Sequence, residues 1–109
     1  MSGKFRVELT QGAERDLETL HDYLAAHRSA EEAQALLDGL LTKIELLETF
    51  PERGNYPKEL LALGIHEFRQ TVLSPYRILY RILAEAVFIM MIADGRRDMA
   101  TLLEQRLLS

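Results

Sequence analysis

Residues 87–92 read VFIMMI, an unbroken apolar run that decides the fold. A strand that is apolar at every position has both faces buried, so we expect it to lie centrally in a sheet and under helices. Two further strand-like runs precede it, at about 64–73 and about 76–84, and are separated by Ser74-Pro75 and by Glu85-Ala86. Such short connections predict antiparallel neighbours.

Two helices come before these strands. Apolar residues recur with helical spacing from Ala13, and Ser29 followed by Glu32 is a capping pattern that begins a second helix. The apolar stripe of the second helix continues to Phe50, and Pro51 ends it. The very short connection between the two predicts an antiparallel helical hairpin that covers one face of the sheet.

The ends of the chain add one strand and one helix. Residues 4–10 alternate polar and apolar side chains, which predicts an amphipathic first strand. Asp94-Gly95 turns the chain after the apolar run, and from Asp98 a final helix runs to the end. The predicted fold class is therefore α+β: a strand, a helical hairpin, three antiparallel strands and a C-terminal helix, in one domain over residues 1–109.

Composition narrows the class of protein. The chain has no cysteine, and no run approaches the roughly 20 apolar residues that span a bilayer. Its start shows no signal-peptide pattern, so we expect a cytoplasmic protein without membrane contact. The net charge of −4 divides into −6 over residues 1–52 and +2 over residues 53–109. This balance argues against strong direct binding to nucleic acid, whereas the second half suits an anion or an acidic partner.

Arginines are concentrated in the second half. Period-two spacing puts Arg77 and Arg81 on one face of their strand. Arg69 on the preceding strand, with Arg96 and Arg97 just past the last one, extends this into a predicted cationic surface of five arginines. Arginine binds carboxylate and phosphate through paired, charge-assisted hydrogen bonds. The alternative for each arginine is an ordinary ion pair with a nearby acid, namely Glu67, Glu85, Asp94 or Asp98.

The chain lacks the residues that most catalytic mechanisms need. His21, His27 and His66 do not have the spacing of a helical metal pair, and there is neither a cysteine nor a glycine-rich phosphate loop. We therefore expect no metal and no cofactor. One enzyme class remains, the metal-free ribonucleases, which need a base, an acid and a cation around the scissile phosphate. Its candidate proton carriers are Glu67, His66, Tyr76 and Tyr80.

The order of these elements and three short motifs resemble the RelE/ParE superfamily of bacterial toxins. The motifs are Phe50-Pro51 before a glycine-containing loop, YRILY at residues 76–80, and IADGRRD at residues 92–98. The resemblance covers nearly the whole chain. It implies a toxin that is encoded beside an antitoxin, which binds it and holds it inactive. RelE-like members of the superfamily cut messenger RNA on the ribosome, whereas ParE-like members inhibit DNA gyrase.

This sequence is more similar to the ParE-like branch. It is not strongly basic, it has no tyrosine or histidine near the end of the last strand, and residues 95–98, GRRD, precede a leucine-bearing helix. The resemblance implies a cytoplasmic gyrase inhibitor that is not an enzyme and that a cognate ParD-like antitoxin neutralises. The alternatives are a RelE-like messenger RNA endonuclease that uses Glu67 or His66, and a non-toxic protein-binding module.

The resemblance also implies which residues make these contacts. Arg96 and Arg97 are assigned to target binding, together with the strand arginines Arg69, Arg77 and Arg81. The terminal helix offers an apolar face to the antitoxin, because helix-in-groove contacts use such spacing. The alternative for this face is packing on the protein's own sheet. Its residues are Met99, Leu102, Leu103 and Leu107.

Overall fold

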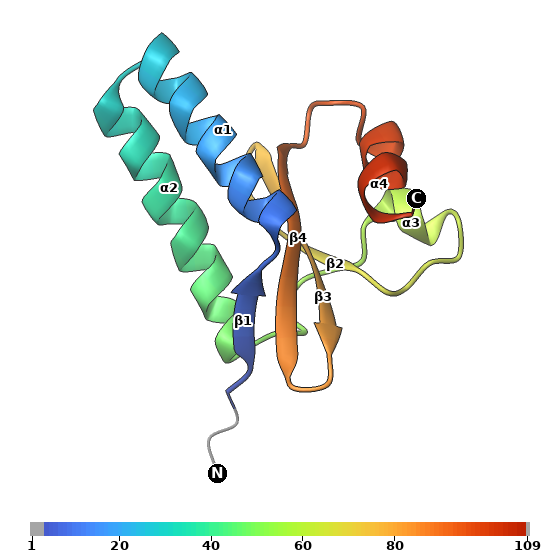
Figure 1. Ribbon diagram of the computed structural model, residues 1–109. Helices are drawn as coiled ribbons and strands as arrows, with labels where there is room; N and C mark the ends of the chain where they lie inside the picture. The colour runs from blue at the N-terminus through green and yellow to red at the C-terminus, as the bar shows by residue number, and fades with distance from the viewer. Residues whose placement is uncertain (1–3, 109) are drawn as a thin grey trace.

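The computed structural model describes residues 4–108. Figure 1 shows the elements in chain order. They are β1 (Arg6–Leu9), α1 (Gln11–His27), α2 (Ala30–Glu45), the short 3₁₀ helix η1 (Leu46–Glu48), α3 (Lys58–Leu61), β2 (Arg69–Leu73), β3 (Tyr76–Leu83), β4 (Ala86–Asp94) and α4 (Met99–Leu107). The predicted α+β class and the predicted order of its main elements are confirmed.

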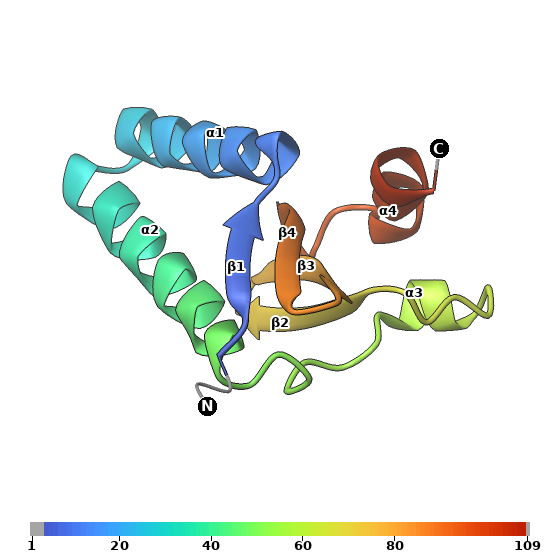
Figure 2. The ribbon, with the colours of Figure 1, turned by 60° about the horizontal axis from the view of Figure 1, so that its bottom comes forward.

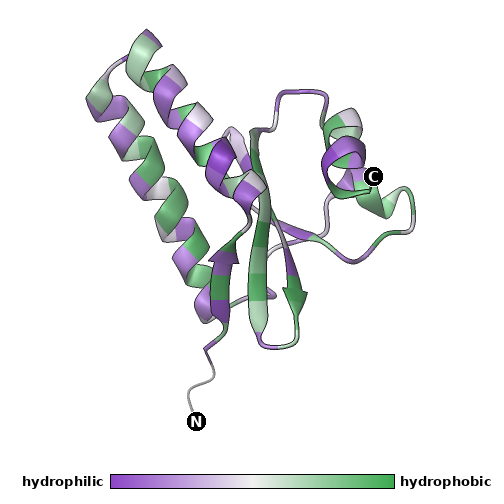
Figure 3. Cartoon of the chain, in the orientation of Figure 1, coloured by the Kyte–Doolittle hydropathy of each residue, from purple (hydrophilic) through white to green (hydrophobic). Residues whose placement is uncertain are grey.

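The described strands form one sheet in the order β1-β4-β3-β2. β3 pairs antiparallel with both β2 and β4, whereas β1 pairs in parallel with β4. A parallel pair needs a long connection, and the chain between β1 and β4 includes the helical hairpin. The apolar strand β4 therefore lies inside the sheet, as its sequence predicts, and Figure 3 shows it as hydrophobic along most of its length.

Helices cover both faces of this sheet. Figure 2 shows α1 and α2 on one side and α3 and α4 on the other. A first core lies under the hairpin, and a second, smaller core lies under α3 and α4. Buried members of the first core include Leu17, Leu40, Ile44, Leu47, Ile78, Tyr80, Val87, Ile89 and Ile92. Those of the second are Leu60, Phe68, Leu79, Met91, Ala93, Met99 and Leu103.

A bulge in β4 distributes its side chains between the two cores. Leu79 pairs with Met91 and Tyr80 pairs with Ile89, which leaves Met90 as an extra residue on β4. Ile89 and Ile92 consequently both enter the hairpin core, although a regular strand would place them on opposite faces. Because every residue of the run is apolar, the sequence tolerates this shift without burying a polar side chain.

The structure departs from the sequence prediction in two places. The strand-like run from 64 to 73 forms a strand only over β2, and the short helix α3 comes before it. Four residues are too few to show a helical period, and Leu60 holds α3 in place because its side chain is buried in the second core. In addition, α2 ends at Glu45 and continues as the 3₁₀ helix η1 before Pro51.

Candidate functional site

The five arginines predicted to form one cationic surface lie in separate places, so the expectation of a single surface is wrong. Arg69 pairs across the sheet with Tyr80, whereas Arg77 pairs with Val72. Directly opposite residues share a face, so Arg69 lies on the hairpin face and Arg77 on the opposite face, one that it shares with Arg81. The register between β2 and β3 determines which face each arginine occupies. The alternation of side chains within one strand does not predict that register.

Arg69 holds the loop that follows η1. Its Nη1 donates to the carbonyl of Gly54 at 2.9 Å and to that of Glu52 at 3.3 Å, and its Nη2 donates to the Tyr56 hydroxyl at 3.1 Å. The guanidinium also lies 4.5 Å from the centre of the Tyr56 ring. These groups use most of the donors of Arg69, so its contacts are those of a structural residue.

The buried Tyr80 ties the same loop to the sheet. Its hydroxyl donates to the carbonyl of Pro51 at 2.7 Å and accepts from the backbone N–H of Gly54 at 3.1 Å. Burial raises the pKa of this hydroxyl. A Cβ on Gly54 would lie only 2.3 Å from the carbonyl oxygen of Gln70, which explains the glycine here. Tyr80 is therefore part of the core, and it has no exposed hydroxyl to offer a substrate.

Arg77 forms a largely buried ion pair. Its Nη1 and Nη2 each lie 2.9 Å from a carboxylate oxygen of Glu59, and its Nε donates to the side-chain oxygen of Gln70 at 2.7 Å. The hydrogen bonds from Arg77 lower the pKa of Glu59. The side chains of Arg77 and Glu59 are only 12% and 15% exposed, so this pair fastens α3 to β3 and offers little surface to a partner.

Arg81 is held less completely. Its Nη2 lies 3.7 Å from a carboxylate oxygen of Glu67, and its guanidinium lies 5.6 Å from the centre of the Phe68 ring. Its Nε is buried and has no hydrogen-bond partner. Arg81 therefore keeps hydrogen-bonding capacity that the described part of the chain does not use.

Arg96 and Arg97 lie in the loop between β4 and α4. Arg96 donates from Nε and Nη2 to the carboxylate of Asp94, at 2.9 Å and 2.6 Å for the shortest contacts. This contact lowers the pKa of Asp94. Arg97 is exposed, and no described residue forms an ion pair or hydrogen bond with its side chain. Of the five predicted arginines, these two are therefore the most accessible to a partner.

The helix that follows this loop is fixed at both of its ends. At its start, the Asp98 carboxylate accepts from the backbone N–H of Thr101 at 3.2 Å and from its hydroxyl at 2.8 Å. Contact with Thr101 lowers the pKa of Asp98. Asp98 is therefore the N-cap of α4, which agrees with the predicted start of this helix, and it sets where the loop ends.

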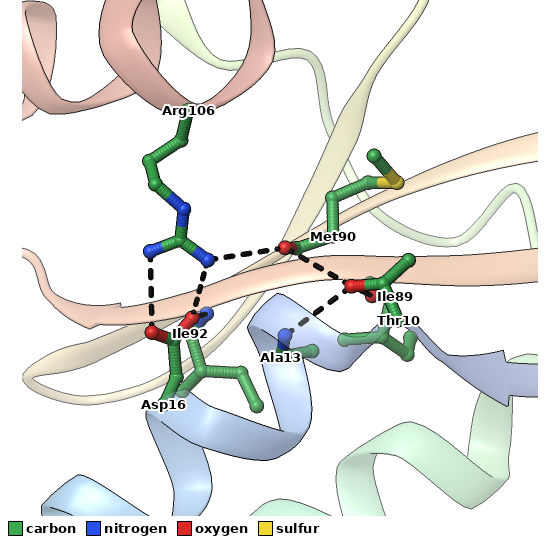
Figure 4. Close-up of polar contacts among 7 residues, drawn as sticks. All are labelled: Thr10, Ala13, Asp16, Ile89, Met90, Ile92 and Arg106. Carbon is green, nitrogen blue, oxygen red and sulfur yellow. Dashed lines mark hydrogen bonds and ion pairs between the residues drawn. The ribbon is translucent and has the colours of Figure 1, made fainter.

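At the other end of α4, Arg106 reaches across to α1 (Figure 4). Its two terminal nitrogens lie 3.1 Å and 3.0 Å from the carboxylate oxygens of Asp16, and that carboxylate also accepts from the backbone N–H of Ile92 at 2.9 Å. Arg106 lies so close to Gly12 that a Cβ there would be 2.9 Å from Nη2. Asp16 and Arg106 were not predicted from the sequence, because 90 positions separate them and no local pattern links them.

The four residues predicted to bind an antitoxin pack on the protein's own sheet. Met99 and Leu103 are 4% and 0% exposed and belong to the second core. Leu102 and Leu107 are partly buried against the same core. In the isolated chain, the apolar face of α4 therefore packs on the protein's own sheet. A role of these residues in antitoxin binding stays a prediction.

The candidate proton carriers do not converge on one arginine. Tyr76 and Tyr80 belong to the hairpin side of the sheet, whereas Glu67 contacts Arg81 on the other side. His66 packs edge-on against Tyr56, with ring centres 5.3 Å apart. Within residues 4–108, no three histidine or acidic side chains are grouped so as to hold a metal ion. The same residues include no helix with the length and apolar character needed to cross a membrane.

Comparison with known proteins places the chain in a family. The family model described as the ParE toxin of the type II toxin-antitoxin system, parDE, matches residues 7–99. The chain belongs to the ParE toxin family. This match extends from β1 to the first residue of α4, so it includes both the hairpin and the Arg96–Arg97 loop of this ParE-family protein.

Solved structures share the ParE-family fold at low sequence identity. A chain of the chromosomal ParDE toxin–antitoxin system from P. aeruginosa superposes with a TM-score of 0.72 at 16% identity, covering 85% of this chain and 98% of that one. A chain of the toxin–antitoxin complex RelBE2 from Mycobacterium tuberculosis gives a TM-score of 0.60 at 20% identity, covering 84% and 98%. The comparison with curated proteins gave no match.

Proposed function

We propose that this ParE-family protein arrests growth by inhibiting DNA gyrase, and that a cognate ParD-like antitoxin neutralises it by direct binding. Membership of the ParE toxin family, over residues 7–99, is the observation that carries the proposal. Gyrase works on cytoplasmic DNA, so the proposed site of action is the cytoplasm. The protein acts in this account by binding gyrase and not by catalysing a reaction of its own.

The charge distribution supports contact with the gyrase protein more than contact with DNA alone. Nucleic-acid binders gain most of their affinity from a broad positive surface, and this chain carries a net charge of −4. Among the five arginines predicted to bind a target, the exposed ones are two neighbours in a short loop, Arg96 and Arg97. Two neighbouring arginines suit a pair of carboxylates on a protein surface.

An uncovered part of the sheet supports the antitoxin contact. Next to α4, the face opposite the hairpin has a shallow, mostly apolar groove whose lining includes Leu83, Phe88 and Met90, together with Arg81. Leu83 is 46% exposed, and the Nε of Arg81 has no partner. An antitoxin segment with apolar residues and one acidic residue would cover Leu83 with the former and pair with Arg81 through the latter.

A gyrase supercoiling assay tests the proposed function. The purified protein, separated from its antitoxin, should inhibit supercoiling or trap cleaved DNA, and stoichiometric antitoxin should restore the reaction. The antitoxin added alone is the control.

A second candidate function is that of a RelE-like messenger RNA endonuclease. The fold that this chain shares with the RelBE2 chain is the reason to test it. Growth arrest with unaffected gyrase at excess protein, together with ribosome-dependent cleavage of messenger RNA, would replace the gyrase proposal with this one. Absence of growth arrest would leave the non-toxic binding module.

A further inference from the structure

A hollow of about 430 Å³ lies between the C-terminal half of α1 and the β4–α4 loop. We call it the hairpin-end hollow. Figure 1 shows α1 and this loop running toward the same end of the sheet, away from the β3–β4 turn. Its lining includes Tyr23 and His27 from α1, Arg28 just after it, Tyr76 from the start of β3, and the two loop arginines, Arg96 and Arg97. None of the α1 residues was assigned a role from the sequence.

The cations around this hollow are free to change partners. Arg28 lies 3.2 Å from Glu32, and the two side chains are 63% and 52% exposed. The side chain of Arg96 is 76% exposed where it meets Asp94, and Arg97 is exposed as well. Exposed ion pairs contribute little to stability, so exchanging them for a partner's carboxylates costs the fold little.

An exposed aromatic pair stands beside these cations. Tyr23 is 59% exposed, and its ring stacks on that of His27 with ring centres 4.2 Å apart. His27 is fixed in turn by the contact of its Nδ1 with the carbonyl of Tyr23 at 2.9 Å. Tyr76 is half-buried at the edge of the hairpin core. Exposed tyrosine next to arginine is the composition of protein interface centres, where rigid rings give contact area at low entropic cost.

The surrounding charge decides which class of macromolecule fits. The hollow has three arginines and one acid, Asp94, along its lining. Beyond it the hairpin is acidic, with Glu18 and Asp22 on α1 and Glu31 at the start of α2. A phosphate backbone carries a long series of negative charges and is repelled by this acidic surround, whereas a short acidic segment needs no more cations than the three arginines of the hollow.

We propose that the hairpin-end hollow receives an acidic segment of gyrase, with a carboxylate paired to Arg28 or Arg97 and an apolar or aromatic side chain seated between Tyr23 and Tyr76. The inference rests on the proposed function, because it places the segment in gyrase. It adds Tyr23, His27 and Arg28 to the target-binding surface and makes α1 part of that surface.

The test compares two substitutions in the hollow with a matched one outside it. Tyr23→Ala removes the exposed ring, and Arg28→Glu reverses one charge. Arg53→Glu makes the same charge change in the loop after η1, beyond the opposite end of α2 (Figure 1). All three sites are exposed, so circular dichroism and antitoxin binding should match the unmodified protein.

Purified gyrase is the probe, in a direct binding measurement and in the supercoiling assay. Tyr23→Ala and Arg28→Glu should each weaken binding and raise the inhibitory concentration by about tenfold or more, the loss typical of an interface anchor. Arg53→Glu should change neither. If both hollow variants inhibit gyrase as strongly as the unmodified protein does, this inference is overturned, whereas the proposed function still stands.

Two other results separate the remaining cases. If the unmodified protein does not inhibit gyrase, the proposed function fails, and with it the assignment of the segment to gyrase. If the protein binds a labelled DNA duplex without gyrase, and Arg28→Glu abolishes that binding, the hollow is a nucleic-acid site and the inference is overturned.

Discussion

Arg77 on β3 and Arg97 after β4 are both arginines of the positively charged second half, yet their surroundings are opposite. Arg77 is largely buried, and its guanidinium is occupied by Glu59 and Gln70. Arg97 is exposed and has no side-chain ion pair or hydrogen bond with any residue of the described chain. The comparison shows that residue type and local charge do not separate a structural arginine from one that is available for binding. Burial and existing partners separate them.

The largest stability effect should come from Arg77→Ala. It leaves the largely buried Glu59 carboxylate without a cation, and breaking such a pair costs about 3 kcal/mol. Urea unfolding measures this loss. The double variant Arg77→Met/Glu59→Leu should recover much of it, because no unpaired charge remains. An unchanged unfolding midpoint with loss of growth arrest would instead make Arg77 a binding residue.

The next largest effect is expected for Arg69→Ala. The carbonyl of Gly54 and the Tyr56 hydroxyl lose their donor, which should lower the free energy of unfolding by about 2 kcal/mol. Tyr56→Phe, which removes only one of these contacts, is the matched comparison and should cost about 1 kcal/mol. If the two variants are equally stable, Arg69 does not hold the loop as described.

The Arg77–Glu59 pair also predicts a pH dependence. Contact with Arg77 lowers the pKa of the Glu59 carboxyl below its usual value of 4.5. As the pH falls, Glu59 is therefore protonated in the unfolded chain before it is protonated in the folded protein. The stabilisation is therefore complete above pH 4.5 and is lost as pH falls through the lowered pKa. Glu59→Gln should be less stable near neutral pH and should show a flatter decline in acid. Parallel curves for the variant and the unmodified protein would exclude this account.

The smallest stability effect is expected for the loop. Replacing Arg96 and Arg97 together by alanine should change the free energy of unfolding by less than about 0.5 kcal/mol, since both side chains are exposed. Growth arrest should nevertheless disappear, while antitoxin binding persists. Full toxicity of the double variant would show that this loop does not contact the target, and the contrast with Arg77 would then lose its functional meaning.

Local signals in the sequence were reliable where a few neighbouring residues determine the structure. The Ser29 hydroxyl accepts from the backbone N–H of Glu32 at 3.0 Å, as the capping pattern predicts, and α4 begins where the sequence predicts it, with Asp98 as its cap. Both depend on atoms three residues apart. The apolar run of β4 likewise indicates an internal position in the sheet, because the edge strands of the fold do not bury both of their faces.

The arginines show what local signals leave open. Period two correctly places Arg77 and Arg81 on one face, but it says nothing of how β2 aligns with β3, and that register sends Arg69 to the other face. The same limit hid the hairpin-end hollow, where Tyr23 and Arg28 meet a loop that lies about 70 positions later in the chain. The sequence around an exposed helix position does not predict which distant segment lies opposite it.

The sequence by itself determined the α+β class, the helical hairpin, the central position of β4 and the ParE resemblance that the family match supports. Only the tertiary structure decided that Arg69 and Arg77 are structural, that Arg106 joins α4 to Asp16, and that α1 borders the Arg96–Arg97 loop. Element types follow from spacing over a few residues. Partners of side chains depend on strand register and on the β4 bulge, which long-range packing fixes.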